Sequence, residues 1–203
     1  MSNEATVFVI DDDQDVREAL QLLMESVGRP VELYASTSRF LDAFDPERPG
    51  CILLDVRMPG MSGLDLQARL AAERLHPPII VITGHGDVPM AVRAMQAGAL
   101  EFLEKPFNDQ VLLDAVHRAL ELDSRQRGEA SRLAELQARY ERLTEREKEV
   151  LALVAEGRMN KVIAAELNVS QSTVEAHRAR VMEKMQARSL SDLMRMVIAL
   201  DMR

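Results

Sequence analysis

Residues 51–73 read CILLDVRMPGMSGLDLQARLAAE, and this stretch decides the fold class. It joins a short uncharged apolar run, 51–54, to a segment over 63–73 whose apolar residues recur at helical spacing. Similar runs predict strands at 6–10, 31–35, 79–82 and 100–103, with helical patterns near 16–27, 88–97 and 108–122. Strands that are apolar on both faces and alternate with helices belong to a parallel sheet covered on both sides. We therefore expect residues 1–122 to form an α/β domain, a doubly wound (βα)5 fold with five parallel strands.

The composition of the chain limits the class of protein. Its 203 residues are 47% hydrophobic, which is enough for two domains. Because no uncharged apolar run approaches the roughly 18 residues of a membrane span, we expect a soluble, cytoplasmic protein with no membrane partner. The single cysteine, Cys51, excludes an internal disulfide, and no Cys and His residues have zinc-finger spacing.

Acidic residues are concentrated in the first part of the chain. Residues 1–123 contain 21 Asp or Glu and 10 Lys or Arg, whereas residues 143–203 contain 9 and 10. The first domain is therefore expected to hold clustered carboxylates. The second is able to approach a polyanion if its basic residues share one face.

Charged and hydroxyl side chains stand where the predicted strands end. They are Asp11, Asp12 and Asp13 after the first strand, Asp55 after the third, Thr83 after the fourth and Lys105 after the fifth. The carboxyl ends of parallel strands share one rim, so these carboxylates repel one another unless a cation binds, and their oxygens suit Mg²⁺. A carboxylate nucleophile, a metal ion and two groups that hold a phosphoryl oxygen are the parts required for phosphoryl transfer to an aspartate.

Three motifs carry a family resemblance. VIDDD (9–13), LLDVRMPGMSGLDL (53–66) and VITGHGDVPMAVRAMQAGALEFLEKPF (81–107) together resemble the receiver domain of bacterial two-component response regulators. The resemblance spans residues 5–122. The stretch TGHGDVPMAV is most similar to the FixJ-like subgroup, in which a receiver is joined to a LuxR-type DNA-binding domain.

The resemblance implies a role for each residue at the rim. Asp55 would accept the phosphoryl group, and the Mg²⁺ ligands would be Asp12, Asp55, the backbone carbonyl of Arg57 and, through water, Asp11. Thr83 would hydrogen-bond the phosphoryl group and Lys105 would pair with it. Phe102 would turn inward as Thr83 moves, and the Lys105–Pro106 bond is expected to be cis.

Several of these residues also have a structural interpretation. Asp13 and Asp15 are interpreted as solvated or as caps of the first helix, not as metal ligands. Taken alone, Thr83 is a strand end and Phe102 a core residue, and only their position beside the other rim residues favours function. Cys51 is interpreted as a packing residue of a buried strand.

Residues 123–142 are rich in Arg, Glu, Gln and Ala, which predicts a helical linker. Leu133, Leu136, Tyr140 and Leu143 follow a rough heptad. This pattern is typical of a short coiled coil, or of one helix that lies on a neighbouring domain, and the second interpretation is preferred.

Residues 143–203 read as a small all-α domain of four short helices. Thr144 and Glu147 form a capping box that opens the first helix, and Gly157 ends it. Asn160 is expected to cap the second helix, and Ser170 a third that runs to about residue 185. A fourth helix is expected over 191–200. A short helix, a tight turn and a longer helix make a helix-turn-helix.

The string over 143–185, LTEREKEVLALVAEGRMNKVIAAELNVSQSTVEAHRARVMEKM, resembles the LuxR-type DNA-binding domain, and that resemblance extends across residues 143–203. Val174, Val181 and Met185 are expected to point inward, with Glu175, Arg178 and Met182 on roughly the opposite side. The candidate DNA contacts are Lys161, Ser172, Thr173, Glu175, His177, Arg178 and Arg180.

Two of these DNA contacts have an open alternative. Glu175 departs from the family pattern, because many relatives carry a basic residue there. Either it accepts a hydrogen bond from a cytosine amino group, or it faces outward without contacting DNA. Arg180 is either a phosphate contact or a member of a surface ion pair.

The sequence therefore predicts a transcriptional response regulator. A sensor histidine kinase phosphorylates Asp55, the receiver forms a homodimer, and paired helix-turn-helix domains bind palindromic promoter DNA, with RNA polymerase a further candidate partner. The candidate dimer residues are Val88, Val92, Met95 and Leu112. The chain is not expected to be an enzyme beyond its own phosphoryl transfer and autodephosphorylation. The rival interpretations are an aspartyl-phosphate phosphatase and a phosphorylation-dependent protein-interaction module with a non-DNA output.

Overall fold

The computed structural model describes residues 4–84 and 86–200. The ends of the two predicted domains, 1–3 and 201–203, lie outside these residues. The chain divides into two compact units, 1–126 and 127–203. None of the helices in the described part of the chain combines the length and apolarity that a bilayer crossing requires.

The first unit contains a five-stranded parallel sheet in the order β2-β1-β3-β4-β5. Its strands are β1 (Thr6–Ile10), β2 (Val31–Tyr34), β3 (Gly50–Asp55), β4 (Ile79–Thr83) and β5 (Glu101–Glu104). The register pairs Ile10 with Leu54, Asp55 with Ile82 and Thr83 with Glu104, so the strands end side by side. The predicted α/β fold and all five strands are confirmed within one or two residues.

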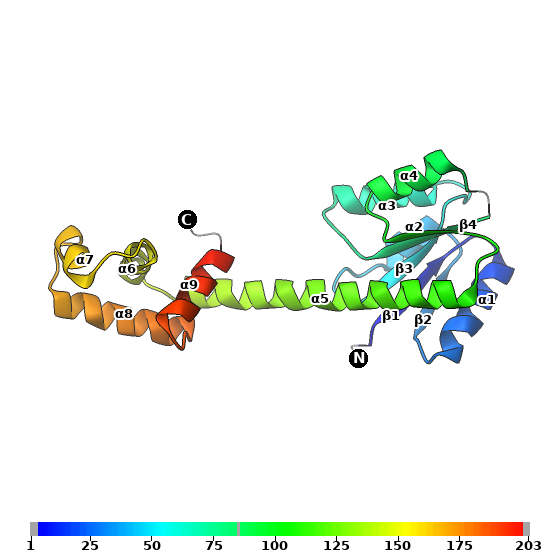
Figure 1. Ribbon diagram of the computed structural model, residues 1–203. Coiled ribbons are helices and arrows are strands. Elements are labelled where there is room, and N and C mark those ends of the chain that lie inside the picture. The colour runs from blue at the N-terminus through cyan, green and yellow to red at the C-terminus, as the bar shows by residue number, and fades with distance from the viewer. Residues whose placement is uncertain (1–3, 85, 201–203) are drawn as a thin grey trace. The chain divides into compact units, whose positions relative to one another are not determined.

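Helices cover both faces of the sheet (Figure 1). Helices α1 (Gln14–Ser26) and α5 (Asp109–Glu141) pack on one face, and α2 (Thr37–Ala43), α3 (Gly63–Ala72) and α4 (Val88–Gln96) pack on the other. The alternation of β1 produces this division, because Val7 and Val9 point to one core and Phe8 and Ile10 to the other. The sequence does not delimit α2, because its seven residues are too few for a clear helical period.

The predicted linker is helical, but it is continuous with the helix before it. Helix α5 runs without a break from Asp109 to Glu141. Asp123, assigned by sequence to the linker, is buried, and its carboxylate accepts a hydrogen bond of 2.9 Å from the backbone N–H of Gly50. Leu133 is 47% exposed, whereas Tyr140 and Leu143 pack into the core of the second unit. The end of the heptad therefore lies on the helical domain that follows.

The second unit contains four further helices. They are α6 (Glu145–Ala155), α7 (Asn160–Glu166), α8 (Gln171–Met185) and α9 (Leu190–Ala199). The Thr144–Glu147 capping box and the Ser170 cap are both present, as predicted. Val174, Val181 and Met185 are buried, which confirms the predicted inner side of α8.

Asn160 does not cap α7, contrary to the sequence-based expectation. The N-cap position is Met159, which makes no side-chain capping bond. Asn160 is the first residue of the helix, and its Oδ1 accepts a hydrogen bond of 2.8 Å from Nη1 of Arg178. A tertiary partner has taken the oxygen that local sequence reasoning assigned to the cap.

Glu147 makes the stability of this unit depend on pH. Burial opposes its ionisation, but the ammonium of Lys184, 2.6 Å away, and the bonds to Thr144 outweigh burial and hold its pKa below the usual value. A carboxyl whose pKa falls on folding stabilises the fold above its unfolded pKa of about 4.3. That contribution is lost as the pH falls through the folded value.

We therefore predict that Glu147→Gln destabilises the second unit by about 1–3 kcal/mol near neutral pH and weakens its acid sensitivity, because Lys184 loses its charged partner. Amide hydrogen exchange of α6 and α8 in the full-length chain measures the loss. The matched control is Glu145→Gln in the same helical turn, where the side chain is 85% exposed and a small effect is expected. Equal effects of the two changes would show that the buried Glu147–Lys184 ion pair stabilises the unit no more than an exposed pair does.

Candidate functional site

Two buried carboxylates share one lysine at the rim of the sheet. Asp55 at the end of β3 is 5% exposed, and Asp11 immediately after β1 is 1% exposed. Nζ of Lys105, just beyond β5, lies 2.6 Å from Oδ2 of Asp11 and 3.2 Å from Oδ1 of Asp55. The structure therefore brings together three residues that are distant in sequence, as predicted from the strand ends.

The backbone holds both carboxylates in place. The N–H of Arg57 donates to Oδ2 of Asp55 at 2.7 Å, and the N–H of Asp13 donates to Oδ1 of Asp11 at 2.9 Å. Behind Asp55, Gly63 approaches so closely that an added Cβ would lie 2.1 Å from the carbonyl oxygen of Asp55. Glycine at this position lets α3 begin directly against the end of β3.

The electrostatics of the site favour additional positive charge. Burial raises the pKa of Asp55, Lys105 lowers it in part, and the neighbouring Asp11 raises it again. Burial opposes the charge on Lys105, yet the contacts with Asp11 and Asp55 raise its pKa overall. One ammonium faces two carboxylates, so the cluster is undercompensated and suits a further cation.

The predicted trio of metal-binding carboxylates is only partly assembled. Within residues 4–84 and 86–200, no three His, Cys, Asp or Glu side chains stand close enough together to hold a metal ion. Asp12 is exposed, whereas Asp11 and Asp55 converge on Lys105. Asp13 caps α1 by accepting from the N–H of Asp15, which confirms its structural interpretation.

The remaining rim residues lie as the strands place them. Thr83 ends β4 and is buried, and the Lys105–Pro106 bond is cis, as expected. Phe102 on β5 is half-buried against the core beneath α4. A Cβ added to Gly86 would lie 3.1 Å from the Phe102 ring, so the loop after β4 rests against that ring.

Of the predicted dimer residues, three are exposed and one is wrong. Val88, Val92 and Met95 on α4 are 77%, 47% and 46% exposed and recur at helical spacing. Leu112 is fully buried in the core between α5 and the sheet, so it cannot contact a second molecule. Its position on the inward face of α5 explains the error, because an apolar residue in a helix does not reveal which face is covered.

The predicted DNA contacts fall into two groups. Lys161, Ser172, Glu175 and Arg180 are exposed on α7 and α8. The hydroxyl of Ser170 lies 2.8 Å from that of Ser172 and 2.7 Å from that of Thr173, so these hydroxyls form a cluster at the start of α8. His177 is half-buried, and its Nδ1 is buried with no hydrogen-bond partner among the described residues.

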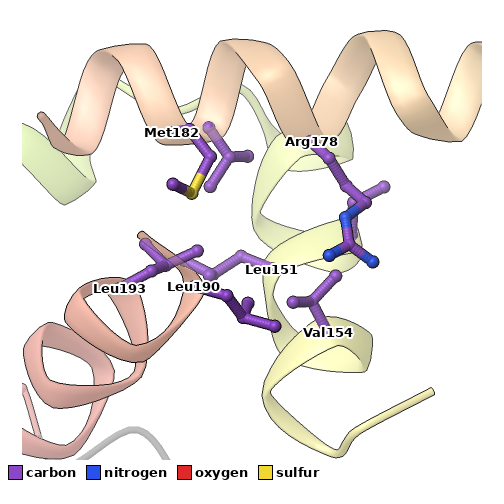
Figure 2. A pocket seen from close by; sticks show the side chains of 8 residues that line it. Leu151, Val154, Arg178, Met182, Leu190 and Leu193 are labelled. Atoms are coloured by element: carbon purple, nitrogen blue, oxygen red, sulfur yellow. The ribbon is translucent and has the colours of Figure 1, made fainter. Parts of the chain in front are cut away.

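Arg178 and Met182 do not lie opposite the core, contrary to the prediction. Arg178 follows Val174 by four residues and precedes Met182 by four, which places all three on one side of α8. Both side chains line a pocket between α6, α8 and α9 (Figure 2). Sequence reasoning missed the partner of Arg178, Asn160, although the four-residue spacing from Val174 already indicated that Arg178 faces inward.

Comparison with known proteins identifies both units. Residues 7–117 match the response regulator receiver domain, and residues 141–197 match the luxR family of bacterial regulatory proteins. The chain is 50% identical over 195 residues to Nodulation protein W of Bradyrhizobium diazoefficiens, covering 96% of this chain and 86% of that protein. It is 46% identical over 195 residues to the transcriptional regulatory protein FixJ of Rhizobium meliloti, covering 96% and 95%. The solved structure of the response regulator StyR is similar, with a TM-score of 0.89 at 48% identity and coverage of 96% and 98%.

The two matched families explain the rim of carboxylates in the first unit and the helix-turn-helix in the second. They are the domains of a regulator, not of a classical enzyme, so the phosphatase interpretation is set aside. A luxR-family second domain likewise sets aside a non-DNA output. The chain belongs to the FixJ-like two-component response regulators and is a DNA-binding transcriptional regulator.

Proposed function

We propose that Asp55 accepts a phosphoryl group from the phosphohistidine of a sensor kinase, and that this modification makes the chain dimerise and bind promoter DNA. The observation that carries the proposal is the buried Asp55 carboxylate, held by Lys105 and the N–H of Arg57 at the end of β3. A carboxylate oxygen attacks phosphorus, the O–P bond forms, and the N–P bond of the donor breaks with the electron pair left on the imidazole.

Two buried carboxylates, Asp11 and Asp55, with Asp12 exposed beside them, support a site for an Mg²⁺ ion at the rim. Mg²⁺ prefers oxygen ligands and keeps several waters, so it needs few protein groups. Asp12, Asp55 and the carbonyl of Arg57 would hold it, with Asp11 acting through a water molecule. When bound, the ion neutralises charge on the phosphoryl oxygens.

Side chains of the protein itself would bind the phosphoryl oxygens. Lys105 already contacts Asp55 and would pair with a phosphoryl oxygen bonded to it, while the Thr83 hydroxyl would donate to another. Movement of Thr83 would draw the loop containing Gly86 with it and free space for Phe102 to turn inward. The consequence is a changed surface beneath α4.

A groove beside Lys105 supports the approach of a kinase. It has a volume of about 330 Å³ and lies between α1 and the start of α5. Its walls are mainly apolar, with contributions from Leu20, Leu23, Pro106 and Phe107. A helix of the kinase seated here would bring its phosphohistidine to the rim that holds Asp55.

The exposed apolar stripe on α4 is the proposed dimer surface, and Val92 lies at its centre. We predict that the phosphorylated wild type is a dimer and that Val92→Glu weakens that dimer at least about tenfold, because it places an unpaired charge in an apolar contact. Sedimentation velocity with and without acetyl phosphate in Mg²⁺ measures the change. Labelled DNA, selected for the wild type from a random-sequence pool, is then titrated with the same samples.

The matched control is Leu22→Glu on α1, an exposed apolar residue outside the stripe, for which the dimer should persist. A wild type that is phosphorylated yet stays monomeric on DNA and in solution would overturn activation by dimerisation. Dimer loss in both variants would indicate a general effect of added charge.

A further inference from the structure

The outer face of α8 is defined by exposure, and Arg178 is not on it. Apart from Gln171 at the start of the helix, the exposed residues recur at helical spacing along one side and are Ser172, Glu175, Ala176, Ala179, Arg180 and Glu183. Arg178 is half-buried and lies three residues before the buried Val181 and seven before the buried Met185. A side chain on the covered side of a helix does not reach a groove that the opposite side enters.

The guanidinium of Arg178 is half-buried and bonds to a residue of the same domain. Figure 2 shows it directed from α8 toward α6, beside Val154. Its Nη1 donates to Oδ1 of Asn160 at 2.8 Å, so the bond joins the middle of α8 to the first residue of α7. The aliphatic part of the side chain packs along apolar walls, which is how arginine stems are commonly buried.

The pocket is too small to be a ligand site. Its volume is about 30 Å³, room for roughly one water molecule. Its other walls come from apolar side chains of α6, α8 and α9. Arg178 is therefore part of the packing between helices, and the charged bond to Asn160 is its directional contact.

We propose that Asn160 and Arg178 form an interhelical clamp that sets the angle between α7 and α8, and so positions the outer face of α8 for DNA. Arg178 is then a positioning residue that acts through Asn160, and it touches neither base nor phosphate. The proposal rests on DNA binding by this domain, and it assigns the contacts to the outer-face residues, including Arg180.

A double-mutant cycle tests the clamp. Arg178→Met, Asn160→Ala and the double variant are compared with wild type, all after acetyl phosphate treatment in Mg²⁺. Fluorescence anisotropy measures binding to the selected duplex over a series of salt concentrations and to duplexes with single base changes. Arg180→Met is the matched control, since it removes a guanidinium from the outer face of the same helix.

For a clamp, each single change weakens binding by about tenfold, and the double variant is no weaker than either single variant. The salt dependence and the ranking of base changes stay those of the wild type. Arg180→Met instead reduces the salt slope by about one unit, as expected for a lost phosphate contact.

Amide hydrogen exchange at the assay temperature verifies that each variant is folded. If Arg178→Met is not folded, Arg178→Lys takes its place, because lysine keeps the charge but lacks the planar fork of arginine.

Three results would overturn the clamp while leaving DNA binding by the domain intact. A reduced salt slope in Arg178→Met, with Asn160→Ala neutral, would make Arg178 a phosphate contact. Relaxed discrimination at one base pair would make it a base reader. Full affinity in Arg178→Lys and Asn160→Ala would show that charge alone matters. A wild type that selects no DNA from the pool would refute the regulatory function itself, and the clamp with it.

Discussion

Asp55→Asn is expected to abolish phosphorylation by acetyl phosphate and to leave DNA affinity at its unphosphorylated level. The amide keeps the size of the side chain and an oxygen to accept from the N–H of Arg57, so the fold should persist. It lacks the carboxylate nucleophile, so no O–P bond forms. In the wild type, phosphorylation should tighten DNA binding by about 5- to 150-fold, the usual range for coupling between two sites.

Phosphate-affinity electrophoresis measures the modification, and anisotropy on the selected duplex measures affinity. The matched control is Asp13→Asn, because Asp13 caps α1 and asparagine caps a helix about as well. That variant should be phosphorylated normally. Removal of Mg²⁺ with EDTA should stop phosphorylation of the wild type as well. Modification of Asp55→Asn at the wild-type rate would place the phosphoacceptor elsewhere.

Gly63→Ala is expected to destabilise the receiver unit by about 2–3 kcal/mol, the cost of overpacking a rigid site. The added Cβ would lie 2.1 Å from the carbonyl oxygen of Asp55 and 3.0 Å from Cγ of Leu54. The nearer atom belongs to the backbone, so α3 must move away from the end of β3. The same movement displaces the segment containing Arg57, whose N–H holds the Asp55 carboxylate, and phosphorylation should slow.

Hydrogen exchange of β1 and β3 amides in the full-length chain measures the destabilisation. Gly128→Ala in α5 is the control, since Gly128 is exposed and an added Cβ meets no atom within 4 Å. There, alanine should stabilise the helix by about 0.5–1 kcal/mol. Unchanged exchange in Gly63→Ala would mean that α3 yields freely and that the close approach has no energetic role.

The sequence predicted the rim well because its members are fixed by strand ends. Asp11 and Asp55 meet because they follow the adjacent parallel strands β1 and β3, and the long side chain of Lys105, which follows β5, reaches both of them past β4. It predicted the metal set less well. Asp12 directly follows a residue that reaches the rim, but it lies in the bend after β1, where strand alternation no longer fixes the direction of a side chain, and it is exposed.

By itself, the sequence determined the α/β fold, the two-domain organisation, the carboxylate rim and the burial of Val174, Val181 and Met185 on α8, since each follows from local periodicity and the polarity of strand ends. Only the tertiary structure decided that Leu112 is core, that Asp123 holds the N–H of Gly50, and that Asn160 pairs with Arg178. The physical reason is that a polar or apolar side chain takes its partner from whichever element packs against it. That partner is distant in sequence, so no local pattern encodes it.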